Sequence, residues 1–325
     1  MKKVTLALLA LAITTSAFAQ ESSSAFNLLK VPVSAHAAAL GGNNVSLIED
    51  DPTLTFNNPA LLASVSDKTI NVNYMTYMKG SQMGSVSFVK TLGERHTLGV
   101  HAQYMNYGSM DETDESGNTT GSFSANDFIL GGQYSYQLTE RWVGGATLNF
   151  IYSKYAEYSS FALGVDVGLN YFDEDKDFSF GLAMRNIGTQ IKRFDEHTDH
   201  LPFTLEAGVT QGIAHAPIRI SLTLIDLTRW SSHYYYNPNT KKDGFGRKLL
   251  NHIVLGVDCV PTDYLYLSVG YNPRRARELK AVDSAHGAGL SFGGGVQLRR
   301  LKFGLAYAKY HQSTSSLLFN LSYKL

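Results

Sequence analysis

The chain of 325 residues has one cysteine, eight prolines and no excess of either charge. A lone cysteine, Cys259, excludes an internal disulfide and a metal site built on cysteines. Lysine plus arginine total 28 and aspartate plus glutamate also total 28, so nothing indicates a nucleic-acid partner. The low proline count, beside 29 glycines, 19 tyrosines and 17 phenylalanines, is typical of long twisted strands rather than helices.

Long hydrophobic runs are also missing after the first 19 residues. The chain opens MKKVTLALLALAITTSAFAQ, in which two lysines precede an apolar stretch and Ala17-Phe18-Ala19 forms a small-x-small cleavage site. The apolar stretch is shorter than the roughly 20 residues that a membrane-spanning helix needs. Residues 1–19 are therefore predicted to be a secretory signal peptide, cut before Gln20. No cysteine lies directly after the cleavage site, so a lipid anchor is not indicated.

What the sequence does contain is period-two alternation, clearest in LSFGGGVQLRRLKFGLAYAKY, residues 290–310. Apolar residues occupy alternate positions on both sides of Arg299-Arg300, and Leu298 and Leu301 flank that pair on the same face. This spacing predicts a hairpin of two antiparallel strands that turns at the two arginines. The same pattern predicts about fourteen strands, at roughly 69–78, 82–92, 96–108, 123–138, 142–153, 157–172, 177–189, 203–213, 217–228, 249–259, 263–273, 285–298, 301–310 and 316–325.

Loop length follows strand parity, which favours a barrel in a membrane over a soluble sandwich. Connections after even-numbered strands are short, as at 139–141 and 299–300, whereas most others are long, as at 109–122 and 229–248. Short periplasmic turns and longer outer loops characterise outer-membrane barrels. The sequence therefore predicts an all-β fold, a single transmembrane outer-membrane β-barrel of about fourteen antiparallel strands over residues 68–325.

Residues 20–67 do not alternate and are predicted to form a separate N-terminal segment ahead of the first strand. The segment contains the pair Gly41-Gly42, the acidic run Glu49-Asp50-Asp51 and the turn-forming Asn57-Asn58-Pro59. A segment of this length has room either to fold into the lumen as a plug or to cap the periplasmic mouth.

The sequence of this segment is similar to sequences of known barrel families. Gly41-Gly42, Asp50-Asp51 and Asn58-Pro59-Ala60 resemble the N-terminal signature of FadL-like fourteen-stranded outer-membrane proteins. The longer run FNLLKVPVSAHAAALGGNNVSLIEDDPTLTFNNPALL resembles the PorQ family, barrel components of the type IX secretion system of Bacteroidota. The resemblance extends through residues 73–75 and 163–171, and so covers nearly the whole mature chain.

The resemblance implies a non-enzymatic anchor in a cell-surface attachment complex. Such a barrel is expected to hold a PorZ-like surface protein, with PorU and PorV in the same complex, while secreted cargo is processed and joined to lipopolysaccharide or a similar glycolipid. No cofactor is implied. The alternative is a FadL-like transporter for hydrophobic small molecules, which needs an apolar lumen and a lateral opening. A hydrolase is disfavoured, because the G-x-S-x-G match at Gly289–Gly293 lies inside an alternating strand.

Two long loops carry the candidate partner-binding residues. One loop has the aromatic cluster Trp230, Tyr234, Tyr235 and Tyr236, and the next has Arg274, Arg275 and Arg277. Exposed aromatic residues near cations are typical of protein-binding hot spots, and the resemblance favours that interpretation. The alternative is an interfacial aromatic belt.

A third loop holds weak candidates for metal ligands, and the inward faces hold several charges. Asp195, His197, Asp199 and His200 are suitable ligands for a divalent cation or a bridge to lipopolysaccharide, although a solvated acidic loop is the favoured interpretation. The inward charges are expected to pair with one another and with the N-terminal segment rather than to line a pore: His101, Asp127, Asp166, Arg185, Glu206, Arg219 and Asp258.

Overall fold

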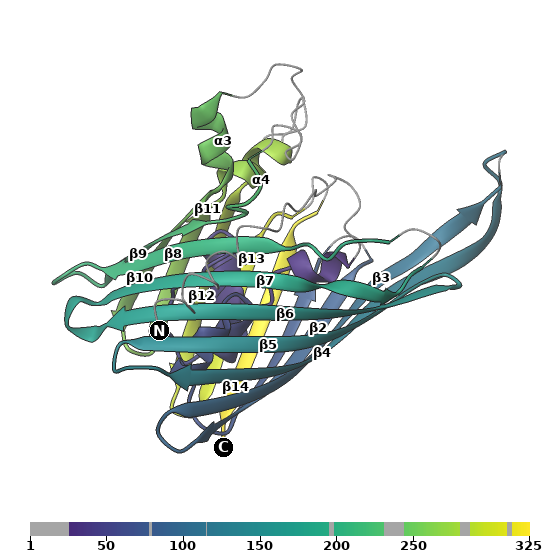
Figure 1. Cartoon of the computed structure of the whole chain (residues 1–325). Coiled ribbons are helices and arrows are strands. Elements are labelled where there is room, and N and C mark those ends of the chain that lie inside the picture. Colours follow the sequence, from purple (N-terminus) through teal and green to yellow (C-terminus); the bar gives the residue numbers. More distant parts are fainter. Residues whose placement is uncertain are drawn as a thin grey trace.

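The computed structural model describes residues 26–77, 80–114, 116–194, 198–230, 244–279, 287–310 and 314–325. Fourteen antiparallel strands form one closed barrel (Figure 1). The predicted all-β barrel is thereby confirmed, whereas the predicted signal peptide lies outside the described residues. The strands are β1 (Thr69–Thr76), β2 (Gln82–Leu92), β3 (His96–Thr113), β4 (Thr119–Gln137), β5 (Trp142–Tyr155), β6 (Tyr158–Asp173), β7 (Phe178–Lys192), β8 (Thr204–Gly212), β9 (Ile218–Leu224), β10 (Ile253–Thr262), β11 (Leu265–Tyr271), β12 (Leu290–Leu298), β13 (Leu301–Ala308) and β14 (Ser316–Lys324).

The barrel closes where the last strand pairs with the first, since Thr69 of β1 lies opposite Lys324 of β14. The predicted hairpin of β12 and β13 is present, with Leu298 opposite Leu301. Arg299 takes the positive φ of 46° that lets so short a turn close. Closure pairs the backbone of every strand, which is what a β-structure in hydrocarbon requires.

The two faces of the wall differ as the alternation predicts. Outward positions of β14 such as Leu317, Phe319 and Leu321 are exposed, whereas the intervening Asn320 and Ser322 are buried inside the barrel. Large apolar residues on the outside and small or polar residues on the inside suit a wall that meets lipid.

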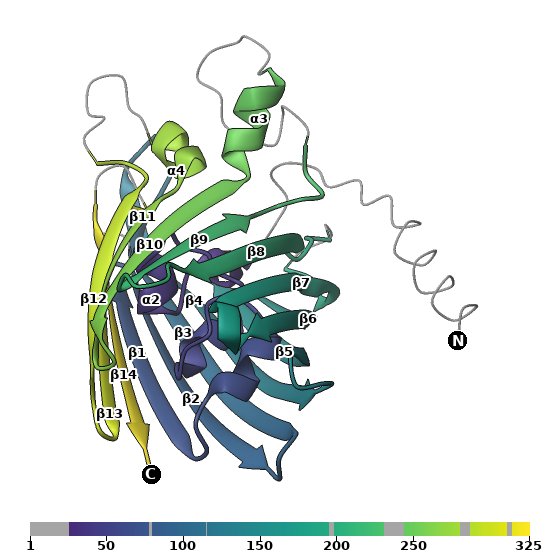
Figure 2. The ribbon, with the colours of Figure 1, turned by 90° about the vertical axis from the view of Figure 1, so that its left-hand side faces the viewer.

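The N-terminal segment lies inside the barrel (Figure 2). It consists of four short helices, of which α2 is α-helical and the others are 3-10 helices: η1 (Asn27–Lys30), α2 (Ala35–Ala39), η2 (Pro52–Phe56) and η3 (Pro59–Ser64). Helix α2 contacts β11 to β14, and η3 contacts β3 to β6 on the other part of the wall. Its leucines at 40, 47, 54 and 61 pack together as an apolar core within the lumen.

The long connections differ from the sequence prediction in several places, and the predicted strand 285–298 begins only at Leu290. The predicted loop 109–122 is mostly strand, because β3 and β4 continue beside each other to Thr113 and from Thr119. The predicted strand 249–259 begins only at Ile253, because residues 245–251 form helix α3 (Phe245–Asn251). The predicted strand 217–228 ends at Leu224, shortly before Asp226 adopts a positive φ of 52° that breaks extended structure.

The remaining helices are short. Helix η4 (Glu174–Lys176) forms the turn between β6 and β7, and α4 (Pro273–Glu278) follows β11. Within the described ranges no helix is both long and apolar enough to cross a membrane. We call the end of the barrel with α3 and α4 the loop end, and the end with the C-terminus the turn end (Figure 1). Arg299-Arg300 lies at the turn end, because the Lys324 amide donates to the Arg300 carbonyl at 2.8 Å.

Candidate functional site

A chain of ion pairs joins the N-terminal segment to the barrel wall. His36 of α2 is fully buried, and its Nε2 lies 2.9 Å from Oδ1 of Asp258 on β10. The imidazole also stacks on Tyr266 of β11, with ring centroids 3.8 Å apart and an interplanar angle of 9°. The same Asp258 oxygen accepts a hydrogen bond from Ser268 at 2.5 Å. The wall therefore holds this helix by hydrogen bonding and ring contact together.

The chain continues through Glu49, which contacts two cations from different strands of the wall. Its Oε1 lies 2.7 Å from Nη2 of Arg219 on β9, and its Oε2 lies 3.0 Å from Nζ of Lys302 on β13. Arg219 also lies 3.6 Å from Asp258, and this contact connects the His36–Asp258 pair to the ion pairs of Glu49. We call His36, Asp258, Arg219, Glu49 and Lys302 the lumen ion chain.

The electrostatic surroundings of Glu49 favour its charged form. Burial by itself raises the pKa of the carboxyl group, but the nearby cations, of which Lys302 contributes most, lower that pKa to about 2. Charges that are buried in this way are tolerated because each has an opposite charge and hydrogen bonds within reach. Removing Glu49 would leave Lys302 without a carboxylate and Arg219 with only the more distant Asp258.

The two glycines of the motif let the N-terminal segment pass close to the barrel wall. Gly41 and Gly42 have φ values of 102° and 107°, a conformation that L side chains rarely adopt. A Cβ on Gly41 would lie 2.4 Å from Cγ1 of Val254, so the segment leaves no room for a side chain there. These two residues therefore shape the chain after α2.

The polar residues of the motif cap the short helices. Asp51 accepts a hydrogen bond from the Thr53 amide at 2.9 Å, and Asn58 accepts one from the Ala60 amide at 3.0 Å. Asn58 also donates to the Val45 carbonyl at 2.7 Å.

The remaining motif residues stabilise the C-terminal part of the segment. Asp50 accepts from the amide and the hydroxyl of Ser66. Pro59 occupies the start of η3, where a proline costs no hydrogen bond. The motif residues therefore stabilise the folded form of the segment inside the barrel.

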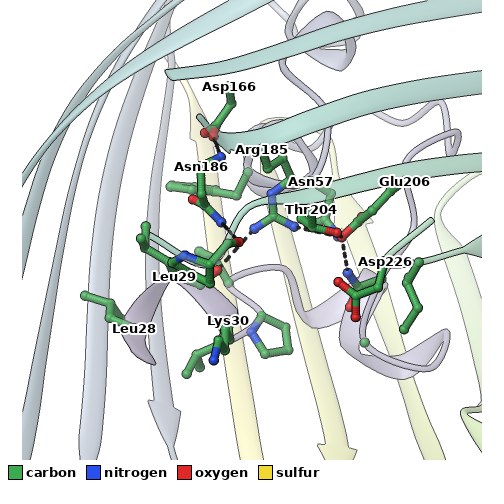
Figure 3. A pocket seen from close by; sticks show the side chains of 18 of the residues that line it. Leu28, Leu29, Lys30, Asn57, Asp166, Arg185, Asn186, Thr204, Glu206 and Asp226 are labelled. Carbon is green, nitrogen blue, oxygen red and sulfur yellow. Dashed lines mark hydrogen bonds and ion pairs between the residues drawn. The ribbon is translucent and has the colours of Figure 1, made fainter. Parts of the chain in front are cut away.

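A cavity of about 300 Å³ lies in the lumen between the N-terminal segment and the wall, below α4 (Figure 3). Arg185 of β7 points into it, with Nη1 3.7 Å from Oε1 of Glu206 on β8 and Nη2 donating to the Leu29 carbonyl at 3.3 Å. Glu206 also accepts from Nδ2 of Asn43 at 3.0 Å. The wall charges thus pair with each other and with the segment, which agrees with the interpretation from sequence.

The rest of the cavity is also polar. Asp166 accepts a hydrogen bond from the Asn186 amide at 2.6 Å, and the Asn186 side chain donates to the Pro202 carbonyl at 3.0 Å. Further charged residues of the lining are Lys30, Asp226, Arg229, Arg274, Arg275 and Glu278. A space with this lining suits water or a small polar molecule better than a hydrocarbon.

The predicted aromatic site is only partly within the described residues. Tyr234, Tyr235 and Tyr236 lie outside them, but Trp230 is described. Its indole donates to the Leu227 carbonyl at 2.6 Å, and its ring stacks on Phe245 of α3 with centroids 6.4 Å apart. Sequence reasoning missed α3, which leaves Phe245 74% and Leu250 50% exposed at the loop end.

The three predicted arginines are brought near this surface by α4, yet each has a contact within the protein. Arg274 pairs with Asp226 at 2.6 Å and with Glu278 at 2.9 Å. Arg277 donates to Asn251 at the end of α3 at 2.8 Å, and α3 and α4 touch. Arg275 lies over the ring of Tyr310 at 4.2 Å and faces the lumen. Their role in binding a partner stays a prediction.

The weak metal candidates gain no support as a cluster. Asp195 and His197 lie outside the described residues, and the amide of Asp199 donates to Gln190 at 2.9 Å. Across the described part of the chain, no three side chains of histidine, cysteine, aspartate or glutamate gather as a metal site would require. A metal at Asp199 and His200 stays a prediction.

Several residues of the lumen ion chain were not identified from sequence. His36 and Lys302 were missed, and Glu49 was noted only as part of an acidic run. A signal was available for Lys302, because it occupies an inward position between the outward Leu301 and Phe303. No comparable signal exists for His36, whose partner Asp258 is 222 residues away.

Comparison with solved structures identifies the architecture. A deltaS2S3 mutant of the TodX monoaromatic hydrocarbon channel has a TM-score of 0.58 and 12% identity, covering 91% of this chain and 98% of that one. The toluene transporter TbuX of Ralstonia pickettii has a TM-score of 0.54 and 12% identity, covering 93% and 97%. A FadL homologue of Pseudomonas aeruginosa has a TM-score of 0.50 and 13% identity, covering 89% and 97%.

At such identities the likeness shows the fold alone. No family model matches the chain, and no curated protein matches it. The closed fourteen-strand barrel, together with these neighbours, makes this chain a bacterial outer-membrane β-barrel protein.

Proposed function

We propose that this protein is a non-enzymatic outer-membrane anchor whose lumen is occupied by its own N-terminal segment and whose loop end holds a surface partner. The observation that carries the proposal is the lumen ion chain. It joins the segment to β9 and β13 through the ion pairs of Glu49, and to β10 through the contact of His36 with Asp258. Because the segment fills the lumen, the surface loops are the parts of the protein that contact a partner in this proposal.

The resemblance of residues 26–62 to the PorQ family supplies the finer proposal. The partner is then a PorZ-like surface protein, in a complex with PorU and PorV, and the cargo is joined to lipopolysaccharide. The exposed apolar side chains of α3 beside Trp230 support a protein-binding role at the loop end, because such patches mark interaction sites.

A second candidate function is transport of hydrophobic small molecules. The structural comparisons favour it over the first, because TodX and TbuX are named as a monoaromatic hydrocarbon channel and a toluene transporter. The polar, charged lining of the lumen cavity favours the anchor, because a hydrocarbon gains little in a space lined by Arg185, Glu206 and Asp166.

One experiment separates the two functions. The tagged protein is purified from native outer membranes in mild detergent, its partners are identified by mass, and the same preparation is tested for toluene uptake in liposomes. The anchor predicts a co-purifying PorZ-like protein and uptake no faster than through empty liposomes. Rapid uptake without that partner would reject the anchor in favour of the transporter.

A further inference from the structure

The hairpin of β3 and β4 continues well beyond the barrel wall at the loop end (Figure 1). These are the two longest strands, of 18 and 19 residues. Pairing of β3 with β2 ends at Asn106, and pairing of β4 with β5 ends at Ala125. Among the described residues, 109–113 and 119–123 therefore pair only with each other. We call residues 109–114 and 116–124 the arm.

The arm is an ordered ribbon rather than a loose loop. At its tip Asp114 accepts hydrogen bonds from the amides of Ser116 and Asn118, at 2.9 and 2.8 Å. Along the ribbon Met110 lies opposite Phe123, an apolar cross-strand pair. A ribbon that is held in register presents its backbone edges in a fixed direction.

The edge of β3 in the arm has backbone groups that point away from β4. The Ser124 carbonyl accepts from the Ala156 amide at 3.1 Å, on the β5 side, so the backbone groups of Ser124 face away from β3. Ser124 lies opposite Ser109, which makes theirs a pair without mutual hydrogen bonds. Such pairs alternate along an antiparallel ladder. Asp111 and its partner Ser122 therefore also direct their N–H and C=O groups outward, toward opposite edges.

The charge of the arm is of one sign. Asp111, Glu112 and Asp114 are acidic, and the sequence has no lysine or arginine between Arg95 and Arg141. The acidic residues lie on or just after β3, whereas residues 119–124 of β4 carry no charge. A second copy of the arm that paired through its own β3 edge would meet this edge with like charges, which destabilises strand pairing. A strand that carries lysine or arginine would meet it with opposite charges.

We propose that the β3 edge of the arm binds an edge strand of the surface partner, and that this strand carries lysine or arginine opposite Asp111 and Glu112. The inference rests on the proposed anchor function and names the surface through which it acts. Main-chain hydrogen bonds supply the affinity in this mode of recognition, and cross-strand charges select the partner. The exposed acidic edge, unused by the barrel itself, is the feature that the partner covers.

The test measures binding of the purified PorZ-like partner to the full-length barrel in detergent. Asp111→Pro removes an outward N–H without touching a hydrogen bond between β3 and β4, whereas Ser122→Pro does the same at the opposite edge. Asp111→Asn removes only the charge. Loss of one N–H bond and obstruction by the ring should weaken binding by about tenfold or more for Asp111→Pro. Ser122→Pro should bind as the unaltered protein does.

The charge variant gives an independent measure. Asp111→Asn should weaken binding by about twofold to fivefold at low salt and reduce the salt dependence, because an exposed pair contributes little and is screened. Equal binding by all three variants and the unaltered protein would overturn the arm as the docking site while leaving the anchor intact. An unaltered protein that fails to bind the partner would overturn both.

Discussion

At the scale of single residues, the lumen ion chain shows how a polar interior is made compatible with a membrane barrel. Glu49 contacts cations from β9 and β13, and His36 contacts a carboxylate from β10. None of these groups faces lipid, and each is paired. The cost of burying charge is offset only while all partners remain in place.

Replacing Glu49 with glutamine should destabilise the folded protein, because Lys302 then loses its carboxylate and Arg219 keeps only the more distant Asp258. We expect a loss of about 3 kcal/mol at neutral pH, the usual scale for breaking a buried pair. The pKa of Glu49 is depressed to about 2, so its stabilising effect is complete above its ordinary pKa of 4.5 and disappears as the pH falls toward 2.

The measurement is thermal unfolding of both proteins, followed on gels without boiling, at several pH values. The difference between them should be constant above pH 5 and close to zero near pH 2. Glu112→Gln in the exposed arm is the control and should unfold as the unaltered protein does. A difference that does not change with pH would show that Glu49 acts through its shape rather than its charge.

At the scale of elements, the N-terminal segment depends on how closely it passes the wall. A Cβ on Gly145 of β5 would lie 2.3 Å from the backbone of Pro59, so this glycine admits the start of η3. Backbone atoms cannot move aside as the end of a flexible side chain can. The glycine is therefore part of the contact surface between wall and segment.

Gly145→Ala should displace η3 and make residues 57–64 accessible. We expect a destabilisation of about 1–3 kcal/mol, as for other insertions into packed sites, and faster deuterium exchange at the amides of η3. Gly132→Ala is the matched control, because a Cβ on that glycine of β4 would meet nothing within 4 Å. Equal deuterium exchange at the amides of η3 in both variants would contradict the close contact of η3 with β5.

The strands could be predicted from sequence, and the helices of the loop end could not. Period-two alternation identified β13 and β14 closely, because apolar and polar residues alternate wherever one face meets lipid. In α3 the neighbours Leu249 and Leu250 fit either period, so the strand was placed too early. The arm was taken for a loop because residues such as Asp111, Gly117 and Asn118 are rare in strands. The contacts of His36 depend on closure of the whole barrel, and no local pattern indicates them.

At the scale of the whole molecule, the position of the termini and the length of the connections determine orientation. The short turns share one end with the C-terminus, and the arm, α3 and α4 share the other (Figure 1). In bacterial barrels the short turns face the periplasm. The loop end therefore faces the outside of the cell.

Epitope tags test this orientation on intact cells. A tag inserted at Ser116, in the tip of the arm, should be labelled by an antibody, whereas a tag at Arg299 should be labelled only after the outer membrane is opened. Both proteins should resist heat as folded barrels do on gels. Labelling of both tags on intact cells would contradict the orientation.

The closing pair of strands also sets an order for assembly. Helix α2 contacts β11 to β14, and η3 contacts β3 to β6, so both lie within a ring that is completed only when β1 meets β14. We expect the segment to be in place before the ring shuts, because its contacts with both groups of strands then form as those strands meet. In this order the segment guides the closing strands into position. Faults in the segment should appear as stalled biogenesis, with unfinished barrels held at the insertion machinery.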